Sequence, residues 1–263
     1  MSIDPSRQII TLTTDFGLAD HYVGVMKGVL LTRCPQATLV DITHEIPAFN
    51  LYAAAYAIDQ AALFFPGGTV HVVVVDPGVG TDRKAILVEA LGQIFVAPDN
   101  GVLSLIAGRS VTRRVREIAN RELFLPVVSS TFHGRDIFAP VAAAVARGLT
   151  PLQSVGPLIE RLEVLPDLAP VETAPGVWQG RVLSVDRFGN LITNFKMKER
   201  FSLEIAGKSI SAVRQTFGAR EAPGLFAYLG SSGFIEVALN RQNAAKELGI
   251  SPGEPICLRD TIS

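Results

Sequence analysis

The sequence predicts an α/β protein with an N-terminal α/β layered domain, built on a largely parallel sheet, and a smaller C-terminal all-β domain. Up to residue 149, short β-prone runs alternate with apolar stretches of helical periodicity, as a layered α/β domain requires. Residues 151–176 are rich in proline and weakly periodic, which is typical of a connection. Beyond them, β-prone runs are separated by Gly, Asn and Pro, which indicates a small all-β domain.

In the first domain, runs rich in β-branched residues predict strands at residues 9–13, 38–42, 70–75, 85–90 and 93–97. Apolar residues at three- and four-residue intervals predict helices in the stretches 21–34, 50–65 and 133–148. Asn50 stands directly before the second of these stretches and is expected to cap that helix.

In the second domain, we expect strands at residues 177–186, 190–195, 202–207, 225–230 and 234–240, and a helix within residues 243–250. The expected organisation is an N-terminal domain at residues 1–157, a linker at 158–176 and a C-terminal domain at 177–263.

The composition favours a small-molecule partner. Of 263 residues, 48% are hydrophobic and 19% are charged, with a formal net charge of −1, so no basic surface favours nucleic acid or an anionic membrane. Cys34 and Cys257 lack CxxC spacing, which argues against a disulfide framework and a zinc cage. No run of about twenty apolar residues occurs, so we expect a soluble, cytoplasmic protein.

A first polar segment, residues 13–17, follows the first predicted strand, and Asp20 and His21 stand just beyond it. Loops at the carboxyl edge of a parallel sheet are where α/β proteins bind ligands. There, the ionised carboxylate of Asp15 can accept hydrogen bonds from both hydroxyls of a ribose. The alternative is that Asp15 or Asp20 caps the following helix.

Two further polar segments follow later in the first domain. In residues 76–83, Asp76 and Arg83 flank a Pro-Gly turn, and the simplest alternative is a turn braced by their ion pair. In residues 129–136, His133 stands at an expected helix N-terminus, where the helix dipole favours the neutral imidazole. The alternative is that this segment only caps the helix, with Ser130 or Thr131 as the cap.

Five motifs together resemble the S-adenosyl-L-methionine (SAM) hydroxide adenosyltransferases, the hydrolytic relatives of fluorinase and SAM-dependent chlorinase. They are TDFG at residues 14–17, VVVVDPGVGTDR at 72–83, FHGRD at 132–136, SVDRFGNLITN at 184–194 and YLGSSGFIEVA at 228–238. The resemblance spans residues 9–258. It implies cleavage of SAM by water to adenosine and L-methionine without metal or cofactor. It also implies a homotrimer whose active sites lie between the N-terminal domain of one subunit and the C-terminal domain of its neighbour.

The resemblance also implies the site residues. The triad that handles the water corresponds to Asp76, Arg83 and His133. The ribose contact corresponds to Asp15, and the large aromatic beside the sugar to Phe49. The contacts to the methionine part correspond to Asp186 and Ser231. The contacts to the adenine correspond to Phe188, Asn190 and Phe217. Glu236 and Asn243 correspond to two positions close to this site.

Departures from the halogenases favour hydrolysis. Halogenases of this superfamily carry Tyr where this chain has Asp76 and Thr where it has Val79, and a carboxylate facing the nucleophile would repel a halide. Fluorinase also carries Ser at the position of Gly134, an inserted loop that this chain lacks, and Arg at the position of Ser232.

Three alternatives to hydrolysis by water alone stay open. They are a SAM-dependent halogenase, a non-catalytic sensor of SAM or adenosine, and a metal-dependent hydrolase. The last could draw its ligands from Asp15, Asp20, His21, Asp76, His133 and Asp136, but no HxH, HExxH or HxD pair supports it.

Overall fold

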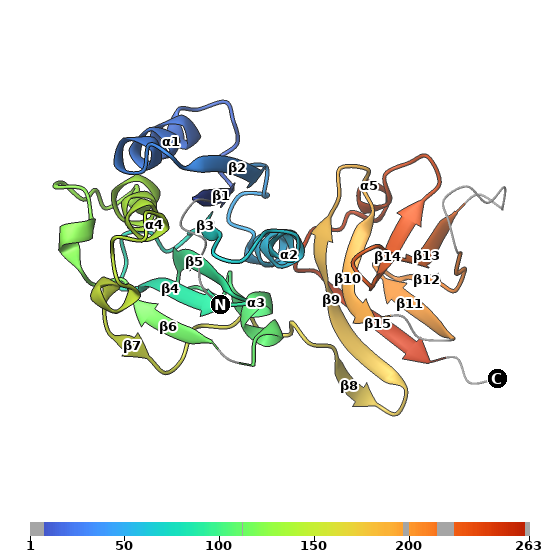
Figure 1. Cartoon of the computed structure of the whole chain (residues 1–263). Coiled ribbons are helices and arrows are strands. Elements are labelled where there is room, and N and C mark those ends of the chain that lie inside the picture. The colour runs from blue at the N-terminus through green and yellow to red at the C-terminus, as the bar shows by residue number, and fades with distance from the viewer. Residues whose placement is uncertain (1–7, 112, 197–199, 215–223, 261–263) are drawn as a thin grey trace. The chain divides into compact units, whose positions relative to one another are not determined.

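The computed structural model describes the chain except for residues 1–7, 112, 197–199, 215–223 and 261–263 (Figure 1). The chain divides into two compact units, residues 1–165 and 166–263. Each unit has its own sheet and its own hydrophobic core.

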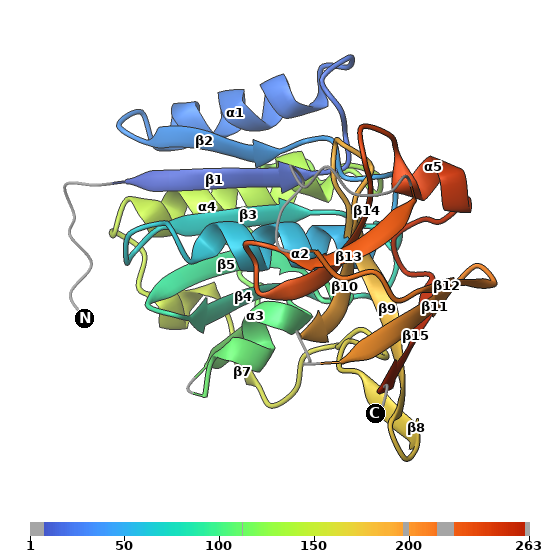
Figure 2. The ribbon, with the colours of Figure 1, turned by 90° about the vertical axis from the view of Figure 1, so that its right-hand side faces the viewer.

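The first unit contains a seven-stranded sheet in the order β2-β1-β3-β5-β4-β6-β7 (Figure 2). β2, β1, β3 and β5 pair in parallel, whereas β4, β6 and β7 join with antiparallel pairings. The bounds are β1 (Ile9–Thr14), β2 (Thr38–Thr43), β3 (Val70–Val74), β4 (Ala85–Ala90), β5 (Gln93–Pro98), β6 (Arg114–Glu117) and β7 (Leu158–Ile159).

Helices cover both faces of this sheet (Figure 1). On one face α1 (Tyr22–Arg33) and α4 (Ala139–Ala146) bury a core that includes Met26 and Phe138. On the other, α2 (Leu51–Ala62) and α3 (Ser104–Arg109) pack over a core that includes Phe95. A π-helix (Gly134–Phe138) leads into α4, and short 3₁₀ turns span Arg121–Leu123 and Leu152–Val155.

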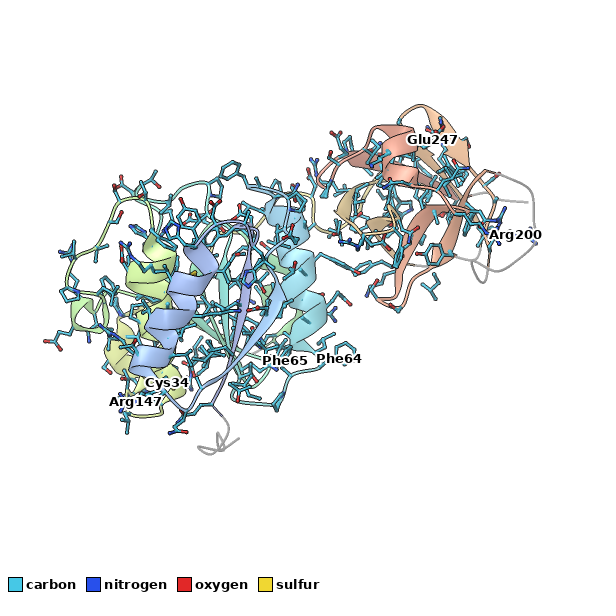
Figure 3. All side chains as sticks on the ribbon, turned by 90° about the horizontal axis from the view of Figure 1, so that it is seen from above. Cys34, Phe64, Phe65, Arg147, Arg200 and Glu247 are labelled. Carbon is cyan, nitrogen blue, oxygen red and sulfur yellow. The ribbon has the colours of Figure 1, made fainter. Side chains whose placement is uncertain are left out.

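Side chains make specific contacts at the start of α2 and at the ends of α1 and α4. The predicted cap of α2 is confirmed, because Asn50 Oδ1 accepts the Ala53 N–H at 2.9 Å. Cys34 and Arg147 lie side by side where α1 and α4 end (Figure 3), and Arg147 donates to the Arg33 carbonyl at 3.2 Å. The Cys34 thiol is buried and free, and this burial raises its pKa.

The second unit is all-β apart from α5 (Ala244–Leu248), with antiparallel strands in the order β12-β11-β15-β9-β10-β14-β13, and β8 on β9. Residues 212–214 pair with β13, so the sheet curls towards a closed barrel. The bounds are β8 (Val171–Ala174), β9 (Val177–Val185), β10 (Leu191–Lys196), β11 (Phe201–Ile205), β12 (Lys208–Ile210), β13 (Leu225–Leu229), β14 (Phe234–Leu239) and β15 (Pro255–Asp260).

The predicted fold class, an α/β layered domain followed by a smaller all-β domain, is confirmed. The parallel part of the first sheet ends at β5, because β4 and β5 form an antiparallel hairpin after the turn at residues 76–83 and β6 pairs antiparallel with β4. The stretch expected to be a connection includes two short strands, β7 and β8. Within the described part of the chain, no helix is long and apolar enough to cross a bilayer.

Candidate active site

The loops after β1 and β3 meet at one edge of the first sheet, because these neighbouring strands are parallel. Asp15 follows the last residue of β1, and Asp76 follows the apolar run that ends β3. Burial raises the pKa of Asp15, and the nearby charge of Asp76 adds to the increase. The structure therefore brings two of the predicted carboxylates to one place at the carboxyl edge.

Asp76 and Arg83 form a close ion pair across their turn. Arg83 Nε lies 3.0 Å from both carboxylate oxygens of Asp76, and Nη2 lies 2.5 Å from Oδ2. Only 10% of the Arg83 side chain and 5% of the Asp76 side chain are exposed, so solvent screens this pair little. The guanidinium also lies over the Phe138 ring, 5.4 Å from its centroid.

His133 joins this pair through the same guanidinium group, because Arg83 Nη2 lies 2.7 Å from His133 Nδ1. A guanidinium carries donors only, so Nδ1 must be the acceptor and the proton of the neutral ring must be on Nε2. Burial and the positive charge of Arg83 lower the pKa of His133, against the opposing effect of Asp76 and Asp136. The imidazole is therefore neutral at pH 7.

The backbone around these three residues is held by close contacts between two loops. Gly80 has φ of +78°, and a Cβ there would lie 2.3 Å from the Ser130 carbonyl oxygen. Only glycine permits this approach of the 76–83 loop to the 129–133 loop. Asp136, which is fully buried, accepts the Ser129 N–H at 2.8 Å and pairs with Arg135 at 2.6 Å, which fixes the second loop.

The structure shows no side-chain capping bond at the residues that precede α1 and the π-helix. The first residue before α1 is His21, which makes no side-chain capping bond, and Asp15 accepts the Phe49 N–H at 2.8 Å instead. His133 precedes the π-helix without a side-chain capping bond. The braced turn at residues 76–83 exists, but its arginine also reaches His133, so it is more than a local turn.

Phe49 adopts a left-handed backbone conformation, with φ of +63°. This is rare for a large side chain and persists only where neighbouring contacts impose it. The residue is 67% exposed, although its N–H is bound to Asp15. The loop that carries it ends at the Asn50 cap of α2, so the aromatic ring is presented to solvent from a tightly held backbone.

In the second unit, Asp186 organises the turn between β9 and β10. Its Oδ1 accepts the N–H groups of Phe188 at 2.9 Å and Asn190 at 2.8 Å, and its Oδ2 accepts from the Asn190 side chain at 2.7 Å. Gly189 packs so closely on Asn243 that a Cβ would lie 2.1 Å from its Cγ. Three predicted residues, Asp186, Asn190 and Asn243, therefore share one small region.

A pocket of about 640 Å³ opens at this turn. Asn190 forms part of its wall, and so does Phe188, a residue that is 78% exposed. The residues that line it are Arg187, Phe188, Asn190, Leu239, Arg241, Gln242 and Asn243. A flat apolar ring beside amide groups suits a heteroaromatic base.

Glu236 lies behind this region on β14, and the Tyr228 hydroxyl donates to its carboxylate. Burial raises the pKa of Glu236, and the nearby charge of Asp186 adds to the increase. A Cβ at Gly230 would lie 1.9 Å from Glu236 Oε1, so glycine is required before the exposed turn that carries Ser231. Phe217 lies outside the described residues.

Sequence reasoning did not identify several residues of these regions. Asp136 was considered only as a metal ligand, and Arg187 and Tyr228 lie inside quoted motifs but were given no role. Arg241 and Gln242 carry no local motif that separates them from other polar surface residues. Among the described residues, no group of three or more His, Cys, Asp or Glu side chains gathers as a metal site would require.

Known proteins match this chain over both units, including the regions described above. The profile of the SAM hydroxide adenosyltransferase N-terminal domain matches residues 10–156, and that of the C-terminal domain matches residues 180–257. An (R)-S-adenosyl-L-methionine hydrolase of Thermus thermophilus is 42% identical, over 93% of this chain and 97% of that protein. A fluorinase of Actinopolyspora mzabensis is 26% identical, over 96% of this chain and 97% of that protein. The crystal structure of an uncharacterized conserved protein from Thermotoga maritima, 40% identical, matches with a TM-score of 0.84, over 95% of this chain and 99% of that one.

Proposed function

The chain belongs to the SAM hydroxide adenosyltransferase family, and we propose that it hydrolyses SAM to adenosine and L-methionine by attack of a placed water on the ribose C5′ carbon. The observation that carries this proposal is the position of Arg83, whose guanidinium contacts the Asp76 carboxylate and the neutral His133 ring together. Its similarity to a named (R)-S-adenosyl-L-methionine hydrolase over nearly the whole chain supports the same substrate.

The reaction needs a placed nucleophile more than an activated substrate. The sulfonium of SAM leaves as the neutral thioether of methionine, so the protein does not have to stabilise a leaving anion. In-line displacement requires the water oxygen opposite the sulfur, about 3–3.5 Å from C5′, and holding that geometry can supply much of the rate enhancement. Close contacts join the loops at residues 76–83 and 129–133, which carry the residues that we assign to this water.

We assign Asp76 as the base that accepts the proton of the water. His133 already uses Nδ1 as an acceptor and carries its proton on Nε2, so it orients Arg83 and offers a donor rather than a base. As the C–O bond forms, the oxygen gains positive charge and its proton becomes strongly acidic, so a carboxylate is basic enough to take it. Arg83 stabilises the hydroxide character that the oxygen gains as Asp76 takes this proton.

The same three residues disfavour halide as the nucleophile. The Asp76 carboxylate neutralises Arg83, so the pair offers no net positive charge to an anion. A halide about 4 Å from the carboxylate would be repelled by up to ~4 kcal/mol at an effective dielectric constant of about 20, and the attraction of Arg83 offsets this repulsion without exceeding it. A water suffers no such repulsion. At Gly134, a Cβ would lie 3.1 Å from Met26 Sδ, so the serine of fluorinase fits here only if its neighbours shift.

The remaining predicted residues are assigned to SAM itself. Asp15 keeps one carboxylate oxygen outside its bond to Phe49, and this oxygen can accept from the ribose hydroxyls. Phe49 lies beside the sugar, and Phe188 and Asn190 contact the adenine, as does Phe217 by resemblance. Asp186 and Ser231 hold the methionine end, and Glu236 and Asn243 stand next to them.

Assembly is a further part of the proposal. The family resemblance implies a homotrimer, with each site formed by the first unit of one subunit and the second unit of its neighbour. The assigned residues are divided between two compact units, and neither unit carries the complete set. Light scattering of active protein should give the mass of three chains. Mixed trimers of Asp15→Ala and Asp186→Ala chains should regain activity that neither variant has alone.

The experiment that tests the proposed function is chromatographic identification of the products after incubation with SAM. Adenosine and methionine should appear in equal amounts, and exhaustive chelation should leave the rate unchanged if no metal takes part. Binding of SAM without turnover would instead favour the sensor. We also place the enzyme in the cytoplasm, since its two described cysteines are free, as a reducing compartment favours.

A further inference from the structure

A chain of polar side chains connects the surface of α1 to the loop after β1. Lys27 Nζ lies 2.6 Å from Asp41 Oδ2, and Asp41 Oδ1 lies 3.1 Å from His44 Nε2. His44 Nδ1 lies 2.8 Å from the Thr14 hydroxyl oxygen. Thr14 and His44 are both buried, so this inner contact is shielded from water.

The direction of each hydrogen bond follows from the groups at the ends. Burial alone would raise the pKa of Asp41, but hydrogen bonds from Lys27 and His44 outweigh it and lower the pKa, so this carboxylate is ionised and accepts only. An ionised carboxylate 3.1 Å from Nε2 favours the tautomer with its proton on Nε2, which leaves Nδ1 as the acceptor. Thr14 donates its hydroxyl proton to Nδ1, while its oxygen accepts the Phe16 N–H at 3.2 Å.

Asp15 lies between two residues that this series of polar side chains holds in place. Thr14 precedes it and Phe16 follows it, and both are fixed through the Thr14 hydroxyl. The His44 carbonyl also accepts the Gly17 N–H at 2.8 Å. The Asp15 carboxylate in turn accepts the Phe49 N–H, so the loops after β1 and β2 are fastened at three points, two of them at His44.

We propose that His44 is a positioning residue that holds Asp15 and Phe49 in the orientation in which they receive the ribose of SAM; this rests on the proposed role of Asp15. No atom of His44 has to touch the substrate. Without its bond to Thr14, the β1–α1 loop would have more conformations, and binding would have to select the competent one. The triad is held by other loops, so the chemical step should be little affected.

Two substitutions at residue 44 separate the two bonds of the ring. In His44→Asn the side-chain oxygen falls near the position of Nδ1 and can still accept from Thr14, while the contact with Asp41 is lost. In His44→Gln the amide falls near Nε2 and can still reach Asp41, while Thr14 loses its acceptor. Thr14→Ser keeps the hydroxyl and Thr14→Val removes it, so this second pair tests the same bond from its other end.

The experiment measures steady-state kinetics with SAM and calorimetric binding of adenosine to each full-length variant. His44→Gln and Thr14→Val should raise the KM for SAM and the Kd for adenosine about tenfold, which corresponds to about 1.4 kcal/mol. Their kcat should stay within about threefold of the wild-type value, because a residue that acts on binding alone changes KM and leaves kcat nearly unchanged. His44→Asn and Thr14→Ser should stay near the wild type.

Other outcomes overturn the proposal. A fall in kcat at unchanged KM in His44→Gln would mean that the residue only maintains the fold or the triad. Equal effects of His44→Asn and His44→Gln would mean that the Thr14 bond is not what matters. Asp15→Asn identifies which premise fails: if it weakens adenosine binding and His44→Gln does not, only the role of His44 is wrong. If Asp15→Asn leaves adenosine binding unchanged, the ribose assignment fails and His44 has nothing to position.

Discussion

Arg83 Nη2 lies 2.7 Å from His133 Nδ1, so the imidazole accepts a hydrogen bond from the residue that is paired with Asp76. This contact requires a hydrogen-bond acceptor at the position of Nδ1. His133→Asn offers a side-chain oxygen near that position, whereas His133→Gln offers one near Nε2. We expect His133→Asn to retain about tenfold more kcat than His133→Gln, since a single bond to a charged group is worth roughly 1.5–3 kcal/mol. Equal kcat values would contradict the assigned tautomer.

The two units should contribute separable parts of substrate binding. Asp15→Asn should weaken SAM and adenosine alike by about tenfold or more, because both contain the ribose hydroxyls and a buried charge-assisted bond is lost. Asp186→Asn should weaken SAM but hardly adenosine, because we assign Asp186 to the methionine end. Calorimetry with SAM, adenosine and methionine measures this. A loss of adenosine affinity in Asp186→Asn would show that its main role is to hold Asn190 in place, which its three hydrogen bonds make a clear second possibility.

Gly80 should be required for catalysis rather than for folding. In Gly80→Ala the new Cβ would lie 2.3 Å from the Ser130 carbonyl oxygen, so the loop of Asp76 and Arg83 must move. A displacement of about 1 Å can cost about a hundredfold in rate, and we expect kcat to fall by roughly ten- to a hundredfold. Gly207→Ala is the matched control, since φ is +71° there and nothing lies within 4 Å. Both variants lose about 1–2 kcal/mol to left-handed strain, so an equal loss of kcat in both would contradict this role.

Much of the site could be anticipated from sequence because strand ends are readable. Asp15 and Asp76 follow apolar runs, and parallel pairing of those strands brings them to one edge. The grouping of Arg83 with His133 came from the family resemblance alone, because no local pattern shows the approach of Gly80 to Ser130 between loops far apart in sequence. β6 was missed because its sequence, RVRE, alternates charged residues, although Arg116 is buried against the Gly156 carbonyl. His44 carries no motif; only its distance from Thr14 reveals it.

His71 should make the stability of the first unit sensitive to acid. It is fully buried in β3, stacks on Phe95 and accepts from Thr11, and burial lowers its pKa to about 4. The unfolded chain takes up this proton near pH 6.5, whereas the folded chain does so only near pH 4. Stability is therefore complete above about pH 6.5 and falls as the pH drops towards 4, by up to about 3 kcal/mol.

Thermal unfolding between pH 7 and pH 4.5 measures this effect. His71→Asn should show a flatter dependence of Tm on pH than the wild type, and the exposed His21→Asn should not. The comparison is made between variants because the raised pKa values of Asp15 and Glu236 act in the opposite direction, stabilising the fold on acidification. A wild-type slope in His71→Asn would assign the acid sensitivity to other groups.

Incubation with SAM in oxygen-18 water and concentrated chloride, followed by mass spectrometry of the nucleoside, tests the central claim most directly. Attack by the water held at Asp76, Arg83 and His133 places the label in the 5′-hydroxyl of adenosine, and Asp76→Ala should slow its formation by roughly two to four orders of magnitude. The account predicts labelled adenosine, with little or no 5′-chloro-5′-deoxyadenosine. Chlorinated nucleoside as the main product, or release of free adenine, would contradict it.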